Sequence, residues 1–252
     1  MVERVSVYRA PTAAADADRI ARWLDERGEW AVDVRGRFLD DASDELARGF
    51  ARARVRSPYD RETGSEMLGV VRYEERALEN PERAGGVIYD GLRVQDALRE
   101  RLPRGERSPE HAHVILLDRV LGTWGEHDGR WHKRVSVLGW PALVSVPGLY
   151  EAPAKPEAYY REQGRRALLS GDPPPREVLE NEVEGEFLIE DDPRTTEALA
   201  GYVLGAVHYL ETGEAFCDDE RCRLSNPHRQ EGVVRAQLRE PEFCPRHAER
   251  YG

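Results

Sequence analysis

The sequence predicts an α/β or α+β fold, that is, a mixed sheet with helices packed on it. Short β-branched and apolar segments alternate along the chain with segments of helical periodicity, as in other folds of this class. The chain has 252 residues, 40% of them hydrophobic, so it can bury a core without a disulfide or a metal. This length predicts one or two domains. We divide the chain into a β-α-β region at residues 1–110 and a second region at residues 111–252, or treat both as one compact domain.

The elements of the first region follow from apolar spacing and from residues that begin or end helices. Thr12 is expected to cap a helix over Ala13–Arg27, and Gly28 is expected to end it. Charged, weakly patterned sequence predicts mostly loop over residues 55–85, with one strand near Met67–Tyr73. The other expected elements are strands at Arg4–Tyr8, Trp30–Val34 and Gly86–Tyr89, helices at Ser43–Arg54 and Leu92–Leu102, and a polar connection at residues 103–110.

Strand-like segments come first in the second region, and helices follow. Trp131–Leu138 and Ala142–Val146 are expected to form a hairpin. Pro147–Pro156 contains three prolines, so we expect no regular structure there. The other expected elements are a strand at His113–Leu117, helices at Glu157–Leu169 and Gln230–Leu238, a break at Ser170–Arg176, and a helix at Pro193–Glu211 capped by Asp191 or Asp192 and ended by Gly213.

The charge balance limits the partners. The chain carries 37 Lys and Arg against 48 Asp and Glu, a net charge of -11, which disfavours binding to nucleic acid or an anionic membrane. Lys133 and Lys155 are its two lysines. We interpret this composition as that of a halophilic archaeon; a GC-rich genome that favours arginine codons is the alternative. No apolar run approaches the roughly 20 residues of a membrane span, and no secretory signal begins the sequence, so we expect a cytoplasmic protein.

The strongest motif lies near the C-terminus, where cysteines and a histidine have the spacing C-x4-C-x21-C-x2-H. Four such donors form the tetrahedral set that zinc prefers, and a filled set has no position for a catalytic water, so we predict a structural zinc. The alternative is three unrelated thiols and a surface histidine. His228 is a reserve ligand in place of His247. The predicted ligands are Cys217, Cys222, Cys244 and His247.

From residue 201 onward the sequence resembles the archaemetzincins, a family of zinc peptidases. Members carry HExxHxxGxxHC, then a second cysteine at C-x4-C spacing, and later a CxxC pair. GYVLGAVHYLETGEAFCDDERC and the later CPRH have this layout, with Gly213 at the family glycine and His247 at the last cysteine. The segments GTWGEHDGRWHKRVSV, PGLYEAPAKPEAYY and FCDDERCRLSNPHRQE also resemble an uncharacterised archaeal family that carries a metallopeptidase label.

The resemblance fails at the catalytic positions. Ala206, Leu210 and Phe216 stand where the family has its histidine ligands, and Val207 stands at the catalytic glutamate. The resemblance therefore implies a metzincin-like core that keeps a structural zinc and has lost the catalytic one. It indicates a non-peptidase binding or regulatory module, with a protein or peptide as a possible partner.

Two other functions remain open. A rearranged metal site at His208 and Glu211, one helical turn apart, would make the protein a hydrolase; His132 or His228 could supply a further ligand. The alternative is an exposed pair on the helix. Nucleic-acid binding through the zinc-bound tail depends on local arginines, and the overall charge argues against it.

A proline-rich loop is the other candidate part of a cleft. It holds Glu151 and Lys155, and prolines fix side chains at little cost in chain entropy. A lysine in a chain that otherwise uses arginine can lose its proton, which a guanidinium cannot. The alternative is a solvated loop with a weak Glu151–Lys155 ion pair.

Overall fold

The computed structural model describes residues 1–40, 43–81 and 85–252. Two sheets organise the chain, a five-stranded one of order β2-β1-β4-β8-β7 and a three-stranded one of order β3-β5-β6. The strands are β1 (Arg4–Tyr8), β2 (Ala31–Arg35), β3 (Ile88–Asp90), β4 (His111–Leu117), β5 (Val120–Gly125), β6 (Arg130–Arg134), β7 (Ser136–Val137) and β8 (Ala142–Ser145). The predicted mixed α/β class is confirmed.

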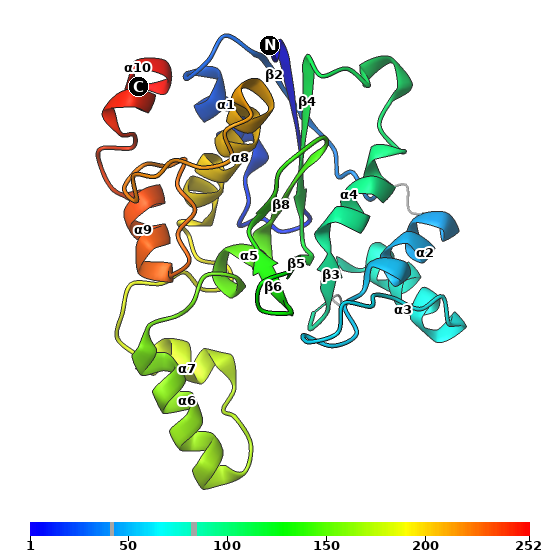
Figure 1. The fold of residues 1–252 in the computed structure, drawn as a ribbon, viewed down its shortest axis with the longest axis vertical. Helices are drawn as coiled ribbons and strands as arrows, with labels where there is room; N and C mark the ends of the chain where they lie inside the picture. The colour runs from blue at the N-terminus through cyan, green and yellow to red at the C-terminus, as the bar shows by residue number, and fades with distance from the viewer. Residues whose placement is uncertain (41–42, 82–84) are drawn as a thin grey trace.

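Helices cover both faces of the larger sheet (Figure 1). They are α1 (Ala17–Asp25), α2 (Asp44–Ala53), α3 (Leu68–Glu79), α4 (Gly91–Arg99), α5 (Val146–Glu151), α6 (Glu157–Ser170), α7 (Arg176–Glu182), α8 (Thr195–Thr212), α9 (Gln230–Leu238) and α10 (Pro245–Tyr251), with a 3-10 turn at Arg104–Glu106. Val5 and Val7 of β1 pack in the core that α1 and α8 complete. Tyr8 points to the opposite core, formed with α2, α3 and α4. This alternation follows from the pleat of the strand.

Four strands of the larger sheet run parallel, and its last strand does not. β1 lies between β2 and β4, and β8 pairs with β4 in the same direction. β7 pairs antiparallel with β8 and forms the edge of the sheet. Strands from residues 1–110 and from residues 111–252 therefore share one sheet.

Helices α6 and α7 project from the body as an arm (Figure 1). Of the α6 side chains, Tyr159 is the one that is buried. Leu168 and Leu169 near the tip are 89% and 75% exposed. Gly171, with a φ of 85°, ends α6 in the left-handed conformation that glycine adopts most easily.

Some boundaries of the first region differ from the prediction. Asp16, not Thr12, caps α1, because its carboxylate accepts a hydrogen bond from the Arg19 backbone N–H at 3.1 Å. Thr12 instead stabilises a turn through its hydroxyl, which accepts from Ala14 N. The helix also ends before Gly28, with Glu26 as its C-cap.

The strand predicted near Met67–Tyr73 was wrong, because α3 occupies Leu68–Glu79. The predicted loop is confirmed at residues 55–67, where isolated bridges but no helix or strand occur. Val71, Glu74 and Leu78 recur at helical spacing on the buried face of α3. The buried charge of Glu74 hides this period from sequence analysis. The part of the predicted loop at residues 82–84 lies outside the described residues.

The absence of regular structure predicted for Pro147–Pro156 was wrong in part. Helix α5 begins at Val146, and Pro147 fits its first turn, where no backbone N–H is needed. Neither Asp191 nor Asp192 caps α8, which begins after Arg194. Strand β5 and helices α7 and α10 were not predicted. Among the described residues, no helix combines the length and the apolar character needed to cross a membrane.

Candidate metal centre and neighbouring groove

The four predicted metal ligands converge. Their ligand atoms, from Cys217, Cys222, Cys244 and His247, all lie within 4.8 Å of one another, so the group could hold a metal ion. The two thiol sulfurs of Cys217 and Cys244 are 3.8 Å apart. Nδ1 of His247 lies 3.2 Å from the sulfur of Cys244 and 3.5 Å from that of Cys222. His228 does not belong to this group.

These distances fit a zinc ion. A tetrahedral ion with bonds of about 2.3 Å to sulfur and about 2.0 Å to nitrogen spaces two sulfurs about 3.8 Å apart and a sulfur and a nitrogen about 3.5 Å apart. Burial raises the pKa of Cys217 to about 12 and raises that of Cys222. Buried thiols of this kind need a nearby cation to become thiolates, which a bound metal supplies.

Two short backbone motifs position these ligands. Cys217 N donates to Leu224 O at 2.8 Å, and Cys222 N donates to Asp219 O at 3.0 Å, so the first pair lies on a tight loop. Cys244 is the N-cap of α10, and the N–H of His247 donates to its carbonyl at 3.0 Å. Cys222 and His247 are buried, and Cys217 and Cys244 are intermediate.

His208 lies beside this centre. Its Nδ1 is 2.8 Å from the Tyr251 hydroxyl, and its Nε2 is 3.7 Å from a carboxylate oxygen of Glu214. His208, Glu214 and His247 form a second group whose ligand atoms lie within 4.8 Å of one another. Nε2 of His247 is buried without a hydrogen-bond partner among the described residues. Burial lowers the pKa of His208.

Glu211 does not share this environment with His208. Its carboxylate accepts from Trp30 Nε1 at 3.0 Å and from Arg250 Nη2 at 2.7 Å. Both oxygens are therefore used to hold α8 against the residue that precedes β2 and against α10. His132, proposed as a helper ligand, lies 2.9 Å from Asp128 on the turn between β5 and β6.

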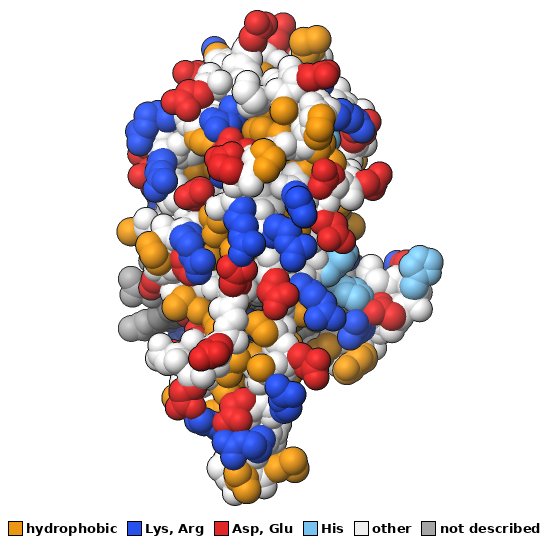
Figure 2. Space-filling model, turned by 90° about the vertical axis from the view of Figure 1, so that its left-hand side faces the viewer, with side chains coloured by type: hydrophobic (Ala, Val, Ile, Leu, Met, Phe, Trp, Pro, Cys, Tyr) orange, Lys and Arg blue, Asp and Glu red, His pale blue; other side chains and the backbone are white. Residues whose placement is uncertain are grey.

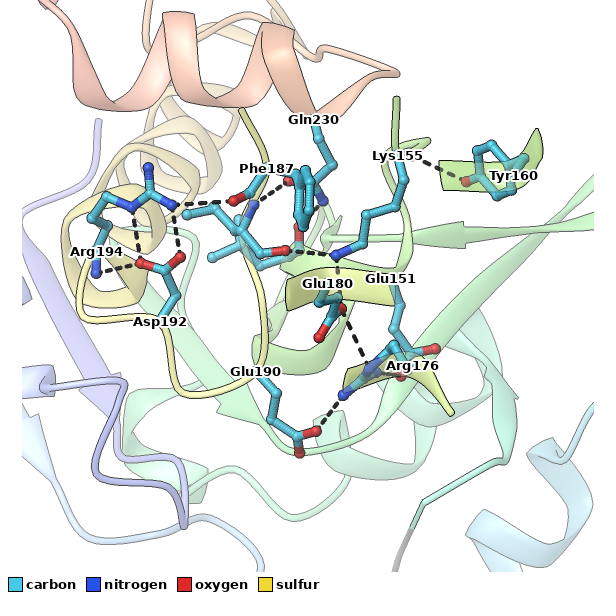
Figure 3. Close-up of polar contacts among 12 residues, drawn as sticks. Glu151, Lys155, Tyr160, Arg176, Glu180, Phe187, Glu190, Asp192, Arg194 and Gln230 are labelled. Atoms are coloured by element: carbon cyan, nitrogen blue, oxygen red, sulfur yellow. Dashed lines mark hydrogen bonds and ion pairs between the residues drawn. The ribbon is translucent and has the colours of Figure 1, made fainter. Parts of the chain in front are cut away.

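Glu151 and Lys155 do not pair with each other (Figure 3). Glu151 accepts from Lys133 Nζ at 2.5 Å and lies 3.8 Å from Arg176. Lys155 Nζ lies 2.9 Å from Glu180 Oε1 and donates to Leu188 O at 2.9 Å. Figure 3 shows Arg176 between Glu151, Glu180 and Glu190.

Lys155 is buried by the arm and by the segment that leads into α8. Its ammonium lies 4.5 Å from the ring centre of Phe187 and 5.7 Å from that of Tyr159. Desolvation lowers the pKa of Lys155, and the hydrogen bond and charge of Glu180 raise it. With its donors directed at a carboxylate and a carbonyl, Lys155 attaches the arm to the body.

A groove of about 380 Å³ runs beside the edge strand β7. Residues 133–138 form one wall, and Phe216, which stands at a histidine-ligand position of the resembled motif, lies in the lining. A second hollow of about 420 Å³ begins beside Cys217. Asn226, Pro227 and His228 line both hollows, so the loop they form lies between them.

The parts of this groove come from distant segments. Arg134 ends β6, and its Nε donates to Thr123 Oγ1 of β5 at 2.7 Å. Ala154 N donates to His228 O at 2.8 Å, which fixes the loop against the chain that follows α5. Sequence analysis did not identify Arg134, because its place in WHKRVSVL resembles that of any strand arginine.

A third cluster of donors lies on the opposite face of the sheet. Glu106, His111 and His113 have ligand atoms within 4.8 Å of one another, and the two imidazoles stack with centroids 4.2 Å apart. Each group already has partners: His113 contacts the Tyr8 hydroxyl, and Arg35 donates to both oxygens of Glu106. We interpret this cluster as a buried polar network.

The surface offers little support for nucleic-acid binding. Figure 2 shows acidic and basic side chains interspersed over one face. Near the metal centre, Arg246 pairs with Glu214, and Arg235 lies 3.9 Å from Glu220. Interspersed charges of both signs do not make the positive field that phosphate backbones require.

No curated protein matches the sequence. Two solved structures are similar in fold. The first is an archaemetzincin from Methanopyrus kandleri, which is 16% identical in sequence; the match covers 98% of this chain and 92% of that chain, with a TM-score of 0.45. The second is a zinc-dependent peptidase from Methanocorpusculum labreanum, which is 11% identical; the match covers 98% of both chains, with a TM-score of 0.47. A family model described as a family of unknown function (DUF7001) matches residues 6–250, and the chain belongs to that family.

Proposed function

We propose that this protein is a peptide-binding module that carries one structural zinc and has no peptidase activity. The observation that carries the proposal is the chemistry of α8 and the residues after it. Where HExxHxxGxxH would supply three imidazoles, Ala206, Leu210 and Phe216 have no donor atom. Val207, at the place of the general base, is fully buried.

The nearby polar groups do not replace the missing ligands in this proposal. Metal-assisted hydrolysis needs an ion with an open position and a base beside it. His208 contacts Tyr251, and both oxygens of Glu211 accept hydrogen bonds from Trp30 and Arg250. A water-activating site built from these two residues would have to break those contacts first.

In this proposal the zinc at the Cys/His centre is structural, which the four converging donors support. Three thiolates and one imidazole would complete a tetrahedron and leave no position for water. The ion would join the loop at Cys217 and Cys222 to the start of α10, two segments that the hydrogen bond from Arg223 N to Glu242 O also holds together. Binding of this kind contributes about 10–16 kcal/mol of apparent free energy in small zinc domains.

The groove favours an extended peptide as the ligand. It lies along β7, the antiparallel edge of the larger sheet. In antiparallel pairs, alternate residues point their N–H and C=O groups away from the partner strand. No described strand pairs with the outer side of β7. A peptide strand can add to such an edge through main-chain hydrogen bonds.

The test begins with the whole protein and a phage-displayed library of random nonapeptides. We expect enriched sequences that bind again as synthetic peptides and that lose binding when alternate backbone nitrogens are methylated. The same preparation should contain one zinc per chain by elemental analysis and should leave the bound peptides uncut after long incubation.

Two variants locate the binding. Ala152→Trp fills the groove, because Ala152 lies in its lining, and should abolish binding. Leu169→Trp, on the exposed tip of the arm, is the matched control and should bind like the wild type. Peptide cleavage, two zinc equivalents per chain, or no enriched peptide at all would each refute the proposed function.

A further inference from the structure

The groove beside β7 differs in charge from the rest of the chain. The whole sequence has 48 Asp and Glu, yet no described residue that lines this groove is acidic. Lys133 and Arg134 both line it. The described lining of this groove therefore contains two basic residues and no acidic one, in a protein with a net charge of -11.

The charge of Lys133 is compensated from outside the groove. Its ammonium lies 2.5 Å from Glu151 Oε2 of α5, and the two side chains are 35% and 26% exposed. Arg134 has no such neighbour. Among the described residues, no carboxylate oxygen lies within 4.0 Å of its guanidinium, and its one side-chain hydrogen bond runs from Nε to Thr123 Oγ1.

This lack of an ion pair distinguishes the half-buried Arg134 from three other arginines that are buried or half-buried. Arg119 lies 2.6 Å from Asp118, Arg223 lies 3.0 Å from Glu242, and Arg35 lies 2.5 Å from Glu106. Burial lowers the pKa of Arg134, and no neighbouring charge raises it. A half-buried cation without a partner is costly, and a ligand carboxylate would offset that cost.

The geometry of the Arg134 side chain suits the binding of a carboxylate. Thr123 fixes the guanidinium at its Nε, and both terminal nitrogens remain without a partner among the described residues. A guanidinium offers these two nitrogens as a planar fork that matches the two oxygens of a carboxylate.

We propose that Arg134 binds a carboxylate side chain of the peptide, so that the groove selects acidic peptides. This inference rests on the proposed function and names its ligand class. We assign the carboxylate to a side chain and not to a peptide C-terminus because a second hollow lies on the other side of the loop at residues 226–228, which lines both. A longer peptide that crosses this loop has room on either side of it.

The first experiment uses the peptides from the phage selection. We expect Asp or Glu at one fixed position of the enriched sequences. The best peptide is then synthesised with a fluorescein label and a C-terminal amide, in three forms that carry Glu, Gln or Lys at that position. Fluorescence anisotropy with the wild-type protein should show the Glu form binding about tenfold more tightly than the Gln form, the size expected for a charge-assisted pair.

The variants then assign the selectivity to one side chain. Arg134→Gln should weaken the Glu form to the affinity of the Gln form and leave the Gln form unchanged. Arg134→Glu should reverse the preference in favour of the Lys form, which a purely structural role of Arg134 would not produce. Thr123→Val keeps the charge, removes the acceptor of Nε, and should reduce the preference for Glu. Arg130→Gln, an exposed arginine on the same strand, is the matched control.

The outcomes separate the two proposals. Peptides that bind equally well with Glu, Gln or Lys would overturn the role of Arg134 and leave the peptide-binding function standing. Binding that requires a free C-terminal carboxylate and is indifferent to the side chain would also overturn it. An unchanged preference in both Arg134 variants would do the same, whereas failure of every peptide to bind would refute the proposed function itself.

Discussion

Lys155 Nζ lies 2.9 Å from Glu180 Oε1, and the two side chains are 7% and 6% exposed. This pair joins the loop after α5 to α7 of the arm, so the body and the arm share a buried charge pair. Removing Lys155 takes away the nearer counter-ion of the buried Glu180 carboxylate and leaves Arg176, at 3.5 Å, to compensate that charge.

We expect Lys155→Met to destabilise the protein by about 3 kcal/mol, the lower end of the range for broken buried pairs. Adding Glu180→Met should recover most of that loss, since an apolar pair of similar volume needs no counter-ion. Denaturant unfolding of both single variants and the double variant measures this. Lys133→Met, at the more exposed pair with Glu151, is the control and should cost under about 1 kcal/mol. Equal losses at the two lysines would contradict the assignment.

The metal centre predicts a difference between two histidines. His247→Ala removes one of four ligands, so the protein should lose zinc during dialysis against a chelator and should unfold at a lower temperature. His228→Ala should keep one zinc per chain, because His228 lies on the groove loop and outside the ligand group. Elemental analysis measures the zinc content of both variants. Zinc loss in the His228 variant alone would show that His228, and not His247, is the fourth ligand.

A double variant tests the hydrolase alternative. Under the proposed function, His208→Ala with Glu211→Ala should leave the zinc content at one equivalent per chain. Stability should fall, because Trp30 and Arg250 lose their shared carboxylate. If a preparation with two equivalents fell to one in this variant, the metal site at His208 and Glu211 would be real.

The buried histidines predict a dependence of stability on pH. Burial lowers the pKa of His113 to about 4 from 6.5, against weaker opposing effects of the Glu106 carbonyl and carboxylate. Because the unfolded chain takes up this proton first, stability is full above about pH 6.5 and falls as the pH drops toward about 4. His113 alone should cost about 2 kcal/mol of unfolding free energy between pH 7.5 and pH 5.

The measurement is denaturant unfolding at both pH values. Arg35, Glu106, His111 and Tyr8 also face His113 and contribute to the background. The comparison is therefore between the wild type and His113→Gln, which should lose less stability on acidification, with His127→Gln on an exposed turn as the control. An identical pH response in the wild type and the His113 variant would rule out this assignment.

The sequence predicted those parts of the fold that depend on local signals. Helix α9 was placed at Gln230–Leu238 because apolar spacing and flanking residues agree. Helix α3 was missed because residues 55–85 are charged and weakly patterned, and Glu74 lies on the buried face of the helix. That carboxylate is in fact 0% exposed and binds Tyr89 and Arg54, which the sequence places far away.

The candidate site also has parts that the sequence predicted and parts that it did not. Short cysteine spacings predicted a candidate metal centre because the ligand geometry of zinc is fixed, and the four donors do converge. The partners of Lys155 and Glu151 were not predictable, since Glu180 and Lys133 come from other elements. The lack of an ion-pair partner for Arg134 among the residues that the structure describes depends on its neighbours in space and cannot be predicted from the sequence.

The order of strands in the larger sheet limits how the chain can be divided. β4, which follows the boundary at residue 110, pairs directly with β1, which opens the chain. Pieces cut at that boundary would each contain half of the central strand pair and expose an unsatisfied row of backbone groups. Produced separately, they should precipitate or remain unfolded; produced in the same cell, they should reassemble by complementation.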